Sequence, residues 1–167
     1  AIPFLTNITI TPANGDIELY IDGVTNDATV PEDTSVNLTA VLLVPSGASD
    51  LVQIYVDGAL AANSTSPATN ISTYQPSVYN ITAVFVGNIN YSGDIQTRFL
   101  TVNDSTSPNV SVTEPLSATF NQTDSVTIAA IVVDNLGVAN ASVNVTYAGG
   151  YVTTLGLWWN GSHYTNT

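Results

Sequence analysis

YNITAVFVGNINYSGDIQTRFLTV, residues 79–102, is the stretch that decides the fold class. Its large apolar side chains Tyr79, Ile81 and Phe85 recur at every second position, between polar residues such as Asn80. This period of two is typical of a β-strand that is buried on one face only. A second strand is predicted over 95–102. The stretch therefore predicts two neighbouring strands with an apolar face directed inward.

The same period recurs along most of the chain, so an all-β fold is expected. Further strands are predicted at 16–22, 36–42, 51–56, 109–113, 125–134, 143–147 and 151–159. Asp57-Gly58 and Gly149-Gly150, each between apolar runs, predict hairpin turns. No window favours a helix longer than one turn. Many short strands separated by Gly, Pro, Asn and Asp turns predict β-sandwiches.

A polar, proline-containing break, NDSTSPN at 103–109, divides the chain. We predict an N-terminal strand at 1–12, a first module at 13–102, a linker at 103–108 and a second module at 109–167. Residues 16–22 and 28–30 are expected to supply the opening strand of the first module. Its sandwich is then complete without residues 1–12.

The charge balance excludes several classes of partner. The chain has no Lys, one Arg (Arg98) and thirteen acidic residues, and its formal net charge is −12. Nothing in it neutralises the phosphates of nucleic acids or of anionic lipids. With almost no ion pairs to lose on acidification, the protein is expected to tolerate an acidic habitat. It has no Cys, so its stability must come from its core, from assembly or from both.

Sequons are far more frequent than composition explains. Of the seventeen Asn residues, twelve stand in N-x-S/T, whereas the Ser and Thr content predicts about four. The twelve are Asn7, Asn37, Asn63, Asn70, Asn80, Asn90, Asn103, Asn109, Asn121, Asn140, Asn144 and Asn160. On a strand the Asn and the Thr of N-x-T share one face, so this face is expected to point outward. The alternative is a polar surface in which sequons arise incidentally. We predict an N-glycosylated, extracellular protein, already processed and without a membrane-spanning run.

Two segments resemble immunoglobulin-like repeats of bacterial and archaeal surface proteins. VQIYVDG at 52–58, followed by YNITAVFVGNINYSGD at 79–94, is similar to the hairpin and the following strands of those repeats. The second module, from SPNVSVTEP onward, resembles another such repeat more weakly. It spans about 60 residues, whereas an immunoglobulin-type sandwich takes about 100. The second module is therefore expected to be incomplete.

A surplus strand at one end and a missing strand at the other are complementary. We expect residues 1–11 of one copy to insert into the second module of a neighbour, which is strand addition in trans. Because donor and acceptor surfaces differ, such contacts propagate into a linear, head-to-tail homopolymer. Two alternatives remain open. Residues 1–11 are an ordinary first strand of their own module, or the missing strands follow the sequence given.

Taken together, the chain resembles the thread-type pilus subunits of thermoacidophilic archaea, which are glycosylated, Ig-like and joined by donor-strand complementation. The resemblance implies a role in adhesion or biofilm formation. It implies a donor strand with four apolar residues, Ile2, Phe4, Ile8 and Ile10. It also implies an acceptor groove among Val126, Ile128, Val132, Val143, Val145, Leu157 and Trp159. Burying the four donor side chains contributes about 6–12 kcal/mol before entropy costs. The alternative is a fragment of a surface-layer or adhesin protein with tandem Ig-like binding modules.

Catalytic and cofactor chemistry has little basis in the sequence. His163 is the only histidine, there is no thiol, and a crosslink that needs lysine is impossible. We predict no enzyme, no cofactor and no metal site. Calcium is a minor alternative at the carboxylates of Asp22, Asp27, Glu32, Asp33 and Asp104. Of the adjacent Trp158 and Trp159, one is expected in the core and the other on the opposite face of the strand.

Overall fold

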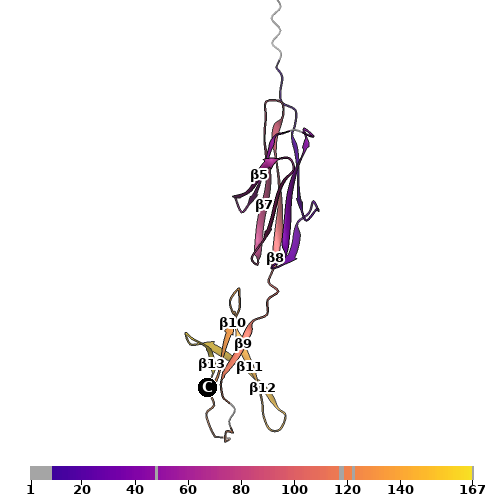
Figure 1. The fold of residues 1–167 in the computed structure, drawn as a ribbon. Coiled ribbons are helices and arrows are strands. Elements are labelled where there is room, and N and C mark those ends of the chain that lie inside the picture. Colours follow the sequence, from indigo (N-terminus) through magenta and orange to yellow (C-terminus); the bar gives the residue numbers. More distant parts are fainter. Residues whose placement is uncertain (1–8, 48, 117–118, 122, 167) are drawn as a thin grey trace, which may run out of the picture. The chain divides into compact units, whose positions relative to one another are not determined.

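The computed structural model describes residues 9–47, 49–116, 119–121 and 123–166. These residues form thirteen strands and no helix (Figure 1), so the all-β fold predicted from the alternation is confirmed. The chain divides into two compact units, residues 1–104 and 105–167. We call them the first and the second module. Their boundary lies within the predicted linker. No helix in the described residues is long and apolar enough to cross a membrane.

The first module is a two-layer sandwich of eight strands. They are β1 (Asp16–Ile21), β2 (Ala28–Pro31), β3 (Ser35–Val44), β4 (Leu51–Val56), β5 (Ala59–Thr65), β6 (Ala68–Thr73), β7 (Ser77–Gly87) and β8 (Ser92–Asn103). One sheet has the order β1-β3-β6 and the other the order β2-β8-β7-β4-β5. All pairs are antiparallel except β2 with β8. This is the strand arrangement of an immunoglobulin-type sandwich.

Alternate residues of the two sheets meet in a closed apolar core. Ile81, Ala83 and Phe85 of β7 are buried, and Asn80 on the same strand is exposed. Fifteen buried side chains form this core: Ile17, Leu19, Ile21, Val36, Leu38, Ala40, Leu42, Val52, Ile54, Ala68, Ile81, Ala83, Phe85, Leu100 and Val102. Residues 79–102, which form most of β7 and β8, therefore supply the centre of one sheet.

The turn at Asp57-Gly58 fixes the β4–β5 hairpin. Both residues have positive φ, 48° and 80°, as the type I′ turn requires. Asp57 also accepts a hydrogen bond from the backbone N of Asn80 through Oδ1, at 2.8 Å. The turn of the predicted β4–β5 hairpin is thus hydrogen-bonded to β7.

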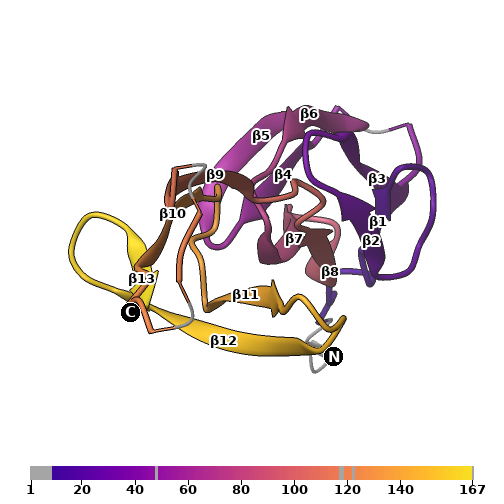
Figure 2. The same cartoon turned by 90° about the horizontal axis from the view of Figure 1, so that it is seen from below.

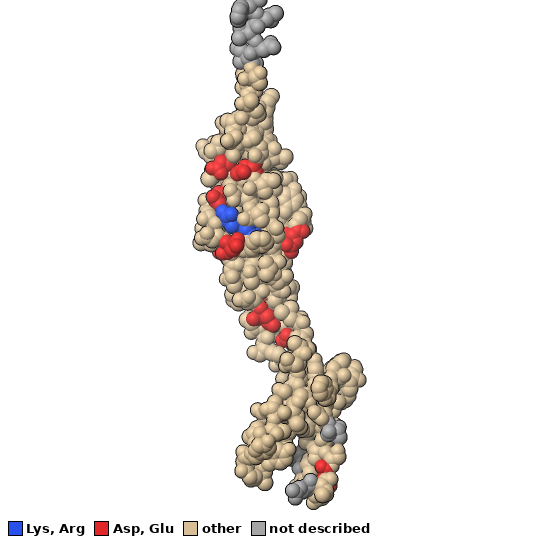
Figure 3. Space-filling model, turned by 180° about the vertical axis from the view of Figure 1, so that it is seen from behind, with Lys and Arg blue, Asp and Glu red and all other residues tan. Residues whose placement is uncertain are grey.

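A single ion pair links the two sheets in the described residues. Nη2 of Arg98 lies 2.9 Å from Oε1 of Glu18, and both side chains are largely shielded from solvent. Figure 3 shows this arginine as the one basic patch, beside acidic side chains.

The chain enters the first module through a tight passage. Ala13 forms a bridge to Tyr91, and the backbone N of Ser92 donates to its carbonyl oxygen at 2.8 Å. A Cβ on Gly15 would collide with the carbonyl oxygen of Ser92 and with the ring of Phe85. Glycine is therefore required here by close packing rather than by an unusual backbone angle.

The second module is one twisted sheet. Its strands are β9 (Asn109–Glu114), β10 (Ile128–Val133), β11 (Ala141–Thr146), β12 (Val152–Trp159) and β13 (Tyr164–Asn166), in the order β11-β12-β13-β10-β9. Strand β12 joins two parts of this sheet, which lie on either side of it. Its first six residues pair with β11, and its last two pair with β13. Figure 2 shows β12 alongside β11 and continuing toward β13.

Several expectations from the sequence need correction. Residues 28–30 do not extend the opening strand, because they form β2 in the opposite sheet, parallel to β8. Strands β5, β6 and β13 were not predicted, and β10 begins at Ile128 rather than at 125. The expectation that one tryptophan is core is wrong, because Trp158 is 72% exposed and Trp159 is 57% exposed.

Candidate functional site

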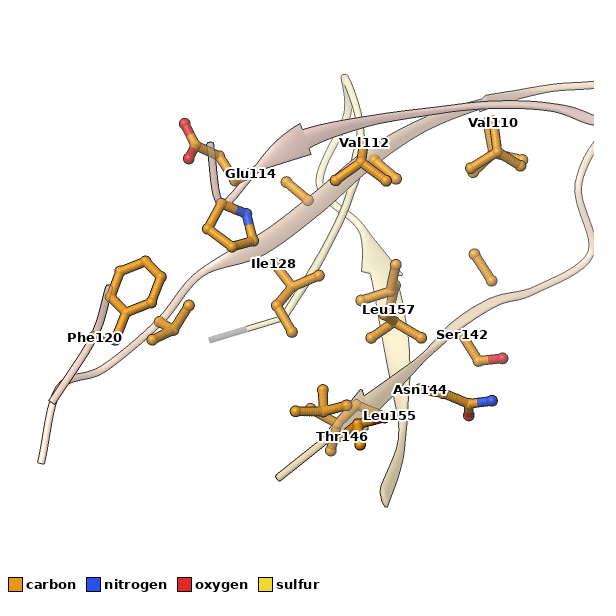
Figure 4. Close-up of a pocket in the computed structure, with 18 of the residues that line it drawn as sticks. Val110, Val112, Glu114, Phe120, Ile128, Ser142, Asn144, Thr146, Leu155 and Leu157 are labelled. Atoms are coloured by element: carbon orange, nitrogen blue, oxygen red, sulfur yellow. The ribbon is translucent and has the colours of Figure 1, made fainter. Parts of the chain in front are cut away.

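The second module contains an open groove where the first module has a core. The groove is a cavity of about 1360 Å³ between strands β9 and β10 on one side and β11 and β12 on the other. Figure 4 shows Val112 and Ile128 on one wall and Leu155 and Leu157 on the other. Such a volume exceeds the usual size of a small-molecule pocket, about 300–1,000 Å³. Residues of four strands line it, so an extended chain is a suitable occupant.

Six of the seven predicted acceptor residues line this groove. They are Val126, Ile128, Val132, Val143, Val145 and Leu157. The seventh, Trp159, lines a neighbouring cavity of about 610 Å³ together with Leu157, Trp158 and Tyr164. The residues thus come from three segments of the second module, at 126–132, 143–145 and 157–159. Their role as an acceptor stays a prediction.

Sequence reasoning missed other apolar side chains of the same groove. Val110 and Val112 of β9, Phe120 and Leu155 also line it. The signal was present, because Val110 and Val112 alternate with polar residues, as do Leu155 and Leu157 in T-L-G-L. Phe120 lies outside any strand, so no period marks it.

Much of this apolar surface is uncovered in the single chain. Val110 is 59% exposed and Val112 is 66% exposed. In the described part of the second module only Ala129, Ala130 and Leu157 are buried apolar residues, against fifteen in the first. An exposed apolar face of this kind is typical of surfaces that bind another protein or a ligand.

Acidic residues of the groove lie near one end of it. Glu114 and Asp124 line it together with Phe120, and Figure 4 shows Glu114 and Phe120 at the same end. Oδ2 of Asp124 accepts hydrogen bonds from the backbone N of Asn121 at 2.6 Å and from its Nδ2 at 3.3 Å. These contacts close a local turn between Asn121 and Asp124. Other polar lining residues, Ser142, Asn144 and Thr146, belong to β11.

One edge of β11 faces the groove without a strand beside it. Strand β12 pairs with the other edge through six residue pairs, from Ala141–Leu157 to Thr146–Val152. In the described residues, no strand pairs with β11 on the groove side. An unpaired edge offers backbone N–H and C=O groups to an incoming strand.

Little of the predicted donor segment is described. Ile2, Phe4 and Ile8, like Asn7, lie outside the described residues. Ile10 is 89% exposed, and residues 9–12 carry no strand. The side chain of Ile10 therefore does not pack into the core of its own module.

The sequons are mostly exposed, as their proposed role requires. Among the eleven described Asn residues of this set, ten are exposed. Thr82 donates a hydrogen bond to Oδ1 of Asn80 at 2.9 Å, and Thr39 does the same to Asn37 at 3.3 Å. The two polar residues of these sequons thus share one strand face. Glycosylation itself stays a prediction.

Asn70 is the exception among them. It is half-buried, its Nδ2 donates to the carbonyl oxygen of Ala61 at 3.2 Å, and its Oδ1 accepts from the hydroxyl of Tyr74. The nitrogen to which a glycan would attach is therefore already engaged within the protein.

The acidic residues considered for calcium serve other roles in the fold. Oδ1 of Asp22 accepts from the backbone N of Asn37, and Oδ1 of Asp27 accepts from the backbone N of Phe99, both at 2.8 Å. No three carboxylate or histidine side chains of the described residues are grouped so as to hold a metal ion. These two carboxylates thus tie loops to strand edges.

His163 belongs to a local turn. Its Nδ1 lies 2.7 Å from Oγ of Ser162, and its Nε2 lies 3.0 Å from Nδ2 of Asn160. Because the amide nitrogen is the donor, Nε2 accepts, and Nδ1 carries the proton of the neutral ring. Both ring nitrogens are therefore occupied by the loop between β12 and β13.

Comparison with known proteins adds little. No protein-family model and no curated protein matches the chain. A solved structure of fibronectin(III)-like modules of CbhA from Clostridium thermocellum is 19% identical, with a TM-score of 0.43. The match covers 89% of this chain and 76% of that chain.

Proposed function

We propose that this protein is the structural subunit of an extracellular, N-glycosylated filament. Residues 1–11 of one copy fill the groove of the next copy by donor-strand complementation. The observation that carries the proposal is the groove of the second module, an apolar cavity of about 1360 Å³ bordered by the free edge of β11.

The donor segment is long enough to run along the strands of the groove, and its apolar residues have the right period. Eleven extended residues span about 36 Å, whereas the six residues of β9 span about 20 Å. Ile2, Phe4, Ile8 and Ile10 recur with a period of two, so they face one side of an extended strand. That side enters the groove, and the side with Asn7 faces solvent.

Assembly follows from the separation of donor and acceptor. The donor residues stand at the beginning of the first module, and the groove belongs to the second module. The contact is therefore heterologous, each copy has one donor and one acceptor, and copies add head to tail. The filament needs neither disulfides nor lysine crosslinks.

The exposed sequons support a location outside the cell. Ten exposed Asn residues distributed over both modules would carry glycans along the finished filament. The resemblance to thread-type pili adds adhesion or biofilm formation as the biological role. The role is structural, not catalytic.

The second candidate is a surface-layer or adhesin fragment with tandem Ig-like binding modules. The closed core of the first module favours it, because that module is complete without a partner. On this alternative the purified chain stays monomeric, and the groove is covered by strands that follow in a longer protein.

Electron microscopy of purified protein tests the proposal. We expect filaments from the full chain and none after deletion of residues 1–11. A matched pair sharpens the test. Phe4→Asp, on the groove-facing side, should abolish filaments, whereas Asn7→Asp, on the solvent side, should preserve them. Filaments of unchanged length and number from the deletion variant would refute donor-strand assembly.

A further inference from the structure

We propose that the inserted strand takes the place in the second module that β7 occupies in the first, antiparallel to β11 on its free edge. The inference rests on the proposed function and assigns its site an edge and a direction. The first module serves as the internal template.

The five strands of the second module correspond to five strands of the first. The antiparallel pairs β1–β3 and β3–β6 match β9–β10 and β10–β13. The hairpin β4–β5 matches β11–β12. The spacing agrees as well, because thirteen residues separate β1 from β3 (22–34) and thirteen separate β9 from β10 (115–127).

Two long strands of the template have no counterpart in the described part of the second module. They are β7 and β8, which pair with each other over most of their length. In the first module β4 lies between β5 and β7, and it pairs with β7 from Val52–Phe85 to Val56–Ile81. Strand β11, the counterpart of β4, has only β12 beside it.

The other edge of the sheet does not have this deficit. Strand β9 ends the sheet of the second module, and its counterpart β1 also ends a sheet in the complete first module. A free edge at β9 is thus part of the finished fold. A free edge at β11 is a departure from it, and a strand added there gives β11 the neighbour that β7 gives β4.

Burial along the two corresponding strands agrees with this choice. Val52 and Ile54 of β4 are fully buried, and they pair with the buried Phe85 and Ala83 of β7. The equivalent inward residues Val143 and Val145 of β11 line the groove and are only half-buried. A strand beside β11 would place apolar side chains next to them on the same face of the sheet, as β7 does for β4.

The N-terminal segment repeats a triplet of β7, the strand that has no counterpart in the described part of the second module. Asn-Ile-Thr stands at 80–82 in β7 and again at 7–9. In β7 the side chain of Ile81 is fully buried, and Asn80 lies on the exposed face. The geometry therefore points to Ile8 entering the groove as Ile81 enters the first core, with Asn7 directed outward.

Disulfide trapping tests the edge and the direction, because the native chain has no cysteine. Thr6 and Ile10 share the parity of Ile8, and Val145 and Gly149 line the groove. With Ile8 in the place of Ile81 and Val145 in the place of Ile54, an antiparallel strand puts Ile10 opposite Val145 and Thr6 opposite Gly149. The double variants Ile10→Cys/Val145→Cys and Thr6→Cys/Gly149→Cys therefore place cysteines together in the antiparallel strand. Ile10→Cys/Gly149→Cys and Thr6→Cys/Val145→Cys do so in a parallel one. All four leave every sequon intact.

Under mild oxidation we expect ladders of covalent multimers on non-reducing gels from the two antiparallel pairs, with no ladder from the parallel pairs or the single variants. Ladders from the parallel pairs would overturn the inference and leave the proposed filament standing. Filaments by electron microscopy with no ladder from any pair would do the same. If even the parent chain forms no filaments, the proposed function fails and this inference with it.

Discussion

Replacing Val112 by alanine measures how much of the groove is filled on assembly. The side chain is 66% exposed in the single chain, so about one third of its surface is already shielded. The change removes two methyl-sized groups. Their burial contributes about 1.6 kcal/mol when it is complete and about 0.5 kcal/mol when one third of their surface is buried. The difference between these two values is about 1.1 kcal/mol. We expect the free energy of association between copies to weaken by this amount. That is about a sixfold rise in the dissociation constant.

Light scattering over a range of protein concentrations gives this constant for the purified chain. Val86→Ala is the matched control, because Val86 is 72% exposed on β7 and does not line the groove. The control should assemble like the parent. Equal dissociation constants for the two variants, within a factor of about two, would refute the filling of the groove near β9.

Four further outcomes are expected. Glycopeptide mass spectrometry of the native protein should find Asn70 unmodified, because its amide nitrogen already donates to a carbonyl oxygen of β5. Gly15→Ala should lower the thermal midpoint, at a cost of about 1–3 kcal/mol, since the new Cβ meets the backbone of β8 and an aromatic ring of the core. Burial, and secondly the neighbouring Tyr79, raise the pKa of Tyr74. The stability that its neutral phenol contributes is therefore present below pH 10 and is lost as the pH rises through the raised pKa. Tyr74→Phe should remove the last component of the tyrosinate absorbance titration. Ile81→Ala should cost about 2–5 kcal/mol in urea unfolding of the first module, because the side chain is fully buried.

The strands with large apolar residues at alternate positions were predictable from the sequence. Leu51–Val56 was predicted with its observed bounds, and its hairpin turn followed from Asp57-Gly58. In these segments a one-residue shift would expose every core side chain, so the local pattern and the fold agree.

Strands β5 and β6 could not be recognised in this way. Their sequences, ALAANST and ATNIST, consist mainly of small and polar residues, and only Ala68 of β6 is fully buried. Their conformation is set by pairing with β4 and β3, which no local pattern reveals.

Many of the apolar residues that line the candidate groove were predictable from the sequence, but the region that the groove covers was not. The six predicted acceptor residues that line it belong to segments predicted as strands. The exposure of both tryptophans was not foreseen, because β12 passes from one layer to the other at Trp158. A strand that changes partners presents both of its faces outside a core, and alternation alone does not show where this happens.

The free edge of β11 also determines how a filament joint would bear tension. A strand held along β11 is pulled along its own axis, so its backbone hydrogen bonds are loaded in parallel and in shear. They must fail together, whereas in a peeling geometry they would fail one after another. The joint between copies would then resist stretching until these hydrogen bonds fail as one unit. Single-filament pulling would show abrupt rupture at high force rather than gradual lengthening.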